Sequence, residues 1–229
     1  MLRRLIKASA IVVGVALAVA ACSPVKMGAA AIVGNQRITI ATLDTEVTNL
    51  SQAAAQYPAA VSLTASQRTQ ATLTWLIRYQ IFEEMARQAG ITVSTAQGQQ
   101  ALNQAVAAAE ASAEQQGLTN VTRTLILAAS GIPPNTADLL GRYESIASQY
   151  LTIANGGTAP AAGSAAQTAA GNKLNQAECQ AAKALNISVN PQFGQLDYNG
   201  YQVVTAPSPV TRTQGPVKSA SPVATAPAC

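Results

Sequence analysis

Histidine is absent from all 229 residues of this chain. Without it no Ser-His or Cys-His nucleophile pair can form, and no metal site can use an imidazole ligand. Two adjacent carboxylates, Glu83 and Glu84, are the remaining candidates for acid–base chemistry. Arg87 follows Glu83 by four residues on the polar side of an expected helix, so we interpret the two carboxylates as part of a solvated ion pair. The sequence predicts no enzyme, no metal site and no bound cofactor.

Charged and aromatic residues are also scarce, at 10% and 4% of the chain. This composition favours helices that pack through small side chains. The net charge of +4 includes Arg3, Arg4 and Lys7, which belong to a segment that we expect to be removed. From Cys22 onward 11 basic residues face 10 acidic ones, a net charge of +1. No basic run with interleaved aromatic residues remains, which argues against nucleic acid as a partner.

The N-terminal segment has the pattern of an export signal. A basic opening is followed by the apolar run from Ala8 to Ala21, which predicts a signal peptide over residues 1–21. The run closes in Val19-Ala20-Ala21-Cys22, which resembles the lipobox of bacterial lipoproteins. In such proteins the cysteine carries acyl chains, palmitate among them, and two chains hold firmly because each buried methylene contributes about 0.8 kcal/mol. Lipid attachment at Cys22 would place the protein on the extracytoplasmic face of the cell membrane; an ordinary secretory signal with an incidental cysteine is the alternative.

Two further cysteines, Cys179 and Cys229, remain once Cys22 is assigned to lipid. An exported protein meets an oxidising environment, so these two residues are a possible disulfide pair. Cys229 is the last residue of a proline-rich tail. Two unpaired thiols are therefore an equally open alternative.

A long amphipathic helix is expected to organise the fold, starting near Gln67 and ending before Gly90. Thr64 and Gln67 have the spacing of a capping box, and Gly90 provides a left-handed stop. The helix contains Trp75, the only tryptophan of the chain, and an apolar arc so wide that several other elements should cover it.

Other local signals predict further elements. Gly34-Asn35 between two apolar runs indicates a hairpin, and Thr39, Ser94 and Thr119 are expected to open helices. Composition divides the chain into a tether, a helical domain, a flexible linker, a helix with a return strand, and a disordered Pro/Ala/Thr-rich tail. The expected boundaries are 22–28, 29–156, 157–172, 173–200 and 201–229.

Three stretches together carry a family resemblance. They are AAIVGNQRITIATLDTEV, LTWLIRYQIFEEMARQAGITVS and AAKALNISVNPQFGQLD, the last with a Val-Asn-Pro-x-Phe-Gly run that is typical of actinobacterial members. In this order they resemble the SurA N-terminal-like chaperone family, which includes the PrsA-type foldases. The resemblance implies a mainly α fold, in which the N-terminal hairpin and the C-terminal return strand share one small sheet. Ile32 and Val33 would then lie near Val189 and Phe193.

One part of the family pattern is missing. Foldase members carry a parvulin-type prolyl isomerase domain before the return strand, and the interval from Gly156 to Gln176 is far too short for one. Parvulin sites also rely on paired histidines. We therefore expect no isomerase activity of that type.

The sequence leads to two main functional hypotheses. The first is a lipid-anchored, extracytoplasmic, chaperone-like protein that transiently binds unfolded or secreted polypeptides without catalysis. The alternative is a structural lipoprotein that holds one specific folded partner at the cell surface, and an enzyme that works without histidine is a third. Six tyrosines are interpreted as core or rim residues, with a groove for extended peptides as the alternative: Tyr57, Tyr79, Tyr143, Tyr150, Tyr198 and Tyr201.

Overall fold

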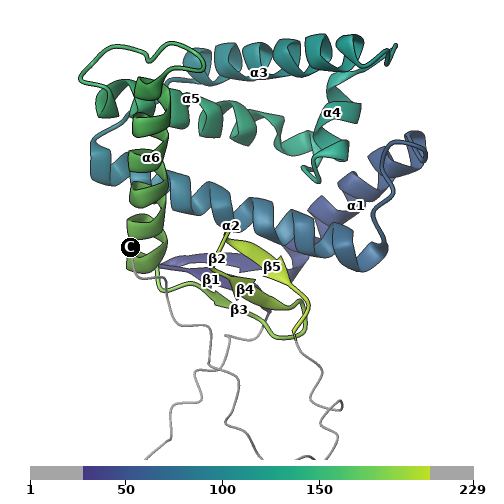
Figure 1. Ribbon diagram of the computed structural model, residues 1–229. Helices are drawn as coiled ribbons and strands as arrows, with labels where there is room; N and C mark the ends of the chain where they lie inside the picture. Colours follow the sequence, from purple (N-terminus) through teal and green to yellow (C-terminus); the bar gives the residue numbers. More distant parts are fainter. Residues whose placement is uncertain (1–27, 207–229) are drawn as a thin grey trace, which may run out of the picture.

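The computed structural model describes residues 28–206 as a mainly helical protein with two small antiparallel sheets, as predicted (Figure 1). The predicted signal peptide, Cys22, Cys229 and the tail from residue 207 lie outside the described residues. In chain order the elements are β1 (Ala29–Val33), β2 (Gln36–Thr39), α1 (Ile40–Gln56), α2 (Ala65–Ala89), α3 (Thr95–Gln115), α4 (Arg123–Ala129), the 3-10 turn η1 (Pro134–Thr136), α5 (Ala137–Ala154), α6 (Ala165–Ala184), β3 (Ser188–Val189), β4 (Gln195–Asp197) and β5 (Gln202–Val204).

Helix α2 runs through the middle of the molecule, between α3 and α5 on one side and the two sheets on the other (Figure 1). Its start is the predicted capping box: the Gln67 amide donates to Thr64 Oγ1 over 3.3 Å, and the Thr64 amide donates to Gln67 Oε1 over 2.8 Å. Its end is the predicted left-handed glycine, Gly90, with φ +66°. The expected wide apolar arc is buried along most of the helix, including Leu73, Ile77, Ile81, Phe82 and Met85.

The first sheet joins the N-terminal hairpin to a strand that follows the last helix. Its strand order is β2-β1-β3, and β3 pairs antiparallel with β1 through Ala31 with Val189 and Ile32 with Ser188. The predicted hairpin and the predicted return strand therefore meet in one sheet. Phe193, which follows β3, packs against the main hydrophobic core.

Two helix boundaries differ from expectation. Helix α4 is capped by Thr122, whose Oγ1 accepts from the Leu125 amide, and not by Thr119, because Asn120 in between adopts φ +59°. Helix α6 begins at Ala165, so residues 165–172 belong to a helix and not to a flexible linker. Ser164 caps this helix by accepting from the Gln167 amide over 3.1 Å.

A second hairpin, formed by β4 and β5, was not predicted. Residues 201–206 were assigned to a disordered tail, yet Tyr201 and Val203 are 8% and 4% exposed. The turn is held by the Asp197 carboxylate, which accepts from the Asn199 amide over 2.9 Å, and by Tyr201 at φ +53°. The Val203 amide donates to Thr74 Oγ1 over 2.8 Å, which fixes β5 against α2.

Helices α3 and α5 pack backbone against backbone where two glycines meet. A Cβ atom on Gly141 would overlap the carbonyl oxygen of Gly98. Because neither glycine carries a side chain, the helices approach closely along their length, and α5 is held between α3 and α2.

Candidate functional site

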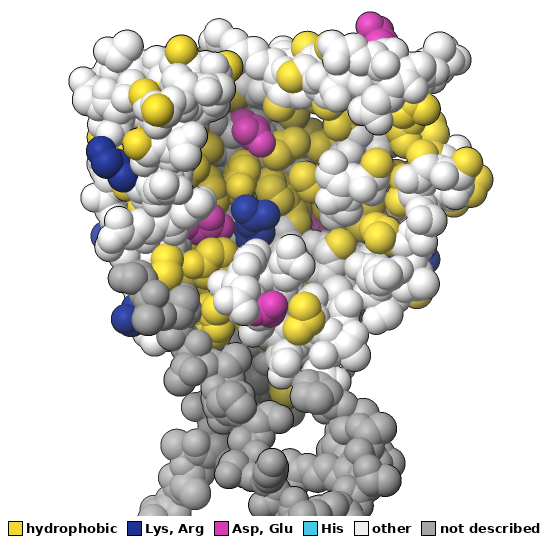
Figure 2. Space-filling model, viewed as in Figure 1, with side chains coloured by type: hydrophobic (Ala, Val, Ile, Leu, Met, Phe, Trp, Pro, Cys, Tyr) yellow, Lys and Arg dark blue, Asp and Glu magenta, His cyan; other side chains and the backbone are white. Residues whose placement is uncertain are grey.

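An open cleft of about 490 Å³ lies along one side of α2, bordered by α5, by β5 and by the segment after α4. Its volume falls within the range of about 300–1,000 Å³ that is usual for ligand sites. Figure 2 looks onto this face: hydrophobic side chains line a hollow beneath the layer of α3 and α5, and acidic and basic side chains stand at its edges. The lining residues are Gln67, Gln70, Ala71, Thr74, Trp75, Arg78, Ser130, Gly131, Ile132, Leu140, Tyr143, Glu144, Gln202 and Val203.

The apolar wall of the cleft is built around Trp75 and Tyr143. Their rings meet edge to face with centroids 5.6 Å apart, and Tyr143 also stacks on Phe82 with centroids 4.0 Å apart. The indole Nε1 of Trp75 donates to Thr136 Oγ1 over 3.0 Å. Both aromatic side chains are thus held in place before anything binds.

The rest of the lining is rich in amides and hydroxyls. Gln67, Gln70 and Gln202 each carry a carbonyl oxygen and an NH₂ group, which together can accept from and donate to a peptide backbone. Gln70 Nε2 donates to Thr205 Oγ1 over 3.1 Å, so the last described residues leave the fold beside the cleft. This arrangement offers apolar contact and hydrogen bonds to a peptide backbone.

One cation, Arg78, lines the cleft. Its Nη2 donates to Tyr143 Oη over 3.1 Å and lies 3.6 Å from Glu178 Oε1 on α6. Arg78 Nε and Glu178 Oε1 are both buried without a hydrogen bond. Burial raises the pKa of Glu178, and the opposing charge of Arg78 lowers it in part. The pair is therefore open to the cleft on the Arg78 side, buried on the Glu178 side, and incompletely hydrogen-bonded.

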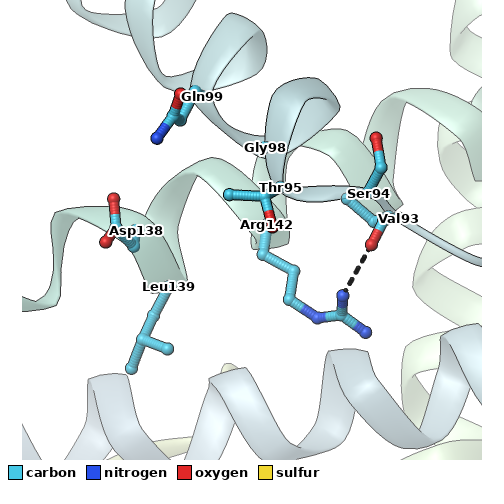
Figure 3. Close-up of a pocket in the computed structure, with 8 residues that line it drawn as sticks. All are labelled: Val93, Ser94, Thr95, Gly98, Gln99, Asp138, Leu139 and Arg142. Carbon is cyan, nitrogen blue, oxygen red and sulfur yellow. Dashed lines mark hydrogen bonds between the residues drawn. The ribbon is translucent and has the colours of Figure 1, made fainter.

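A smaller pocket of about 210 Å³ surrounds Arg142, where α5 meets the start of α3 (Figure 3). The guanidinium points away from Asp138 and donates to the Val93 carbonyl over 3.0 Å. It also forms an ion pair with Glu83 of α2. Since the guanidinium is occupied by protein groups, we interpret this pocket as a joint between helices.

The ion pair that we expected within α2, between Glu83 and Arg87, does not form. Glu83 instead reaches Arg142 of α5. Arg87 pairs with Glu84 over 2.5 Å, one turn away on the exposed side. Burial, with a further contribution from Glu83, raises the pKa of the neighbouring Tyr79 to about 12.

The other predicted site residues do not gather at the cleft. Cys179 lies on α6 and is disulfide-bonded, while Cys22 and Cys229 are outside the described residues. Within residues 28–206 no group of three or more Cys, Asp or Glu side chains is placed to hold a metal ion. In the same range no helix combines the length and the apolar character needed to cross a membrane.

Sequence reasoning missed most of the cleft. Tyr143 was named only within a set of six tyrosines, and Arg78 and Glu178 were not singled out. These two residues are 100 positions apart, and no local pattern links them. A usable signal was an arginine placed within the apolar arc of α2, since a charge there needs a partner from another element.

The fold and the cleft define a mainly helical, cleft-bearing protein in which the N-terminal hairpin shares a sheet with β3. Comparisons with protein-family models, curated proteins and solved structures find no match for this chain.

Proposed function

We propose that this protein is a lipid-anchored, extracytoplasmic, chaperone-like protein that transiently binds unfolded or secreted polypeptides without catalysis. The observation that carries the proposal is the composition of the cleft. Its aromatic wall suits apolar side chains of any sequence, and its glutamines suit the peptide backbone that all polypeptides share. The sheet shared by β1 and β3 adds support, because the resemblance to SurA N-terminal-like chaperones implies that pairing.

The size of the cleft argues for weak and short-lived binding. A volume of about 490 Å³ admits a few side chains and no folded domain. Apolar burial contributes roughly 25 cal/mol per Å², and much of that gain is offset by the ordering of an unfolded segment. Weak capture allows a client to leave and fold.

The cellular location rests on the lipobox resemblance at Cys22 and on the disulfide bond of Cys179, since disulfides persist in oxidising compartments. Intact mass of the protein extracted from membranes tests both. We expect the loss of residues 1–21, the addition of acyl chains at the new N-terminus, and two fewer hydrogens from one disulfide. A mass that matches the unprocessed chain would contradict the anchor.

The binding role is tested by the aggregation of an unfolded client, followed by light scattering. Residues 28–206 contain both hydrophobic clusters and the whole cleft, so the chain from residue 23 onward retains the fold. We expect this chain to delay aggregation at near-stoichiometric amounts, and Leu140→Gln, which makes the cleft wall polar, to shorten the delay. Ile153→Gln is the matched control, because Ile153 lies on the same helix, is 55% exposed and does not line the cleft.

The alternative, a lipoprotein that holds one folded partner, gives a different result in cells. Crosslinking through a photoreactive residue at position 140 should yield many products if the cleft takes unfolded clients. One dominant product would favour the single-partner hypothesis. No delay of aggregation with several clients, together with one dominant crosslink, would reject the chaperone-like role.

A further inference from the structure

Glu144 is a carboxylate on the wall of the cleft that has no partner within the described part of the chain. It lies on α5 next to Tyr143 and is partly buried. Two other carboxylates at helix contacts differ from it, since Glu83 pairs with Arg142 and Glu178 with Arg78. Removing a carboxylate from water without a compensating partner is unfavourable, and burial alone raises the pKa of Glu144.

The charges around the cleft leave an excess of one negative charge. Arg78 is the cation of the lining, and Glu178 faces it from behind over 3.6 Å. The guanidinium of Arg78 also donates a hydrogen bond to the Tyr143 hydroxyl, and its central carbon lies 5.9 Å from the centre of the Tyr143 ring. With Arg78 already balanced by Glu178, the charge of Glu144 is the one that a ligand can neutralise.

We propose that the cleft selects polypeptide segments in which a lysine or arginine stands beside apolar residues, with Glu144 accepting the cationic group. The inference rests on the proposed function and names the class of segment that the same cleft takes. Lysine and arginine have long apolar stems, which can lie on Tyr143 and Leu140 while the charged end reaches the carboxylate. A charge-assisted hydrogen bond is stronger in such a partly desolvated place than at an open surface.

The test compares matched fluorescent peptides by anisotropy, with the chain from residue 23 onward as the receptor. One short peptide has a central lysine among leucine, valine and phenylalanine; in the others the lysine is replaced by acetyl-lysine or by glutamate. We expect the lysine peptide to bind about tenfold more tightly than the acetyl-lysine peptide, the effect of one hydrogen bond to a charged group. The glutamate peptide should bind least.

Glu144→Gln should abolish this preference, so that the lysine and acetyl-lysine peptides bind the variant with equal affinity. Glu114→Gln is the matched control, because Glu114 is an exposed helical glutamate away from the cleft, and it should keep the preference. Equal binding of lysine and acetyl-lysine peptides to the unaltered protein, or a preference that survives Glu144→Gln, would refute the role of Glu144 and leave the proposed function standing. Failure of all peptides to bind would reject both. A preference that appears only in a chain ending at Ala206 would mean that residues 207–229 fill the cleft, and the proposal of a separate polypeptide would then fail.

Discussion

Gly141 is the position where the packing of α3 on α5 is most sensitive to a single added methyl group. The methyl of Gly141→Ala would overlap the carbonyl oxygen of Gly98, a backbone atom that can move only if the helix moves. Overpacking of this kind costs about 1–3 kcal/mol, against which the better helix propensity of alanine returns about 0.8–1 kcal/mol. The difference is up to about 2 kcal/mol, and because the overlapping atom belongs to the backbone we expect a net destabilisation toward that upper end, together with a wider spacing of α3 and α5.

Gly98 provides the matched comparison from the opposite helix. A methyl group there would meet its nearest atom, the amide nitrogen of Arg142, at 3.5 Å, an ordinary van der Waals distance. The helix propensity of alanine should then outweigh any steric cost of the added methyl group. Gly98→Ala should therefore leave the protein as stable as before or stabilise it by up to about 1 kcal/mol. Urea unfolding followed by far-ultraviolet circular dichroism and by the fluorescence of Trp75 measures both. If Gly141→Ala unfolds at the same urea concentration as the unaltered protein, or if Gly98→Ala is the more damaging change, the described packing is wrong.

Three further changes test other parts of the structure. Thr64→Ala removes the side-chain acceptor at the start of α2 and should cost about 1 kcal/mol in urea unfolding; no loss would argue against the cap. Arg142→Gln breaks the ion pair with Glu83 of α2 and the hydrogen bond to the Val93 carbonyl, and it should lower the free energy of unfolding by about 1–2 kcal/mol. Arg87→Gln breaks only an ion pair within α2 whose arginine is exposed, so it should change the free energy of unfolding by no more than about 0.5 kcal/mol. Burial raises the folded-state pKa of Glu144 above its ordinary 4.5, so its unfavourable contribution appears as the pH rises from 4.5 through the raised pKa. The stability gained by Glu144→Gln should grow across that window, while Glu114→Gln should show no such trend; parallel pH profiles for the two variants would contradict this.

The parts of the fold that depend on neighbours in sequence could be predicted. Thr64 with Gln67, and Gly90, fix the ends of α2 through bonds within a few residues of one another. The Gly34-Asn35 turn likewise sets the register of β1 on β2. Such signals need no knowledge of the tertiary fold.

Features that depend on distant residues or on composition alone were missed. The start of α6 is rich in alanine, like the linker before it, so only the cap at Ser164 separates the two. Strand β5 is three residues long, although Asn199-Gly200 before it is a common hairpin turn and could have indicated it. The partner of Glu83 was predicted one turn away and lies 59 positions along the chain, because the orientation of α5 decides it.

Strand β1 begins at Ala29, which has no exposed surface, and the strand lies between β2 and β3. If acyl chains are attached at Cys22, the seven residues from 22 to 28 can span at most about 25 Å. The sheet would then stay close to the lipid headgroups, and the protein could not range far into the space beyond them. Its effective concentration would be highest for chains that are just emerging from the membrane, so even a weak affinity could suffice for their capture.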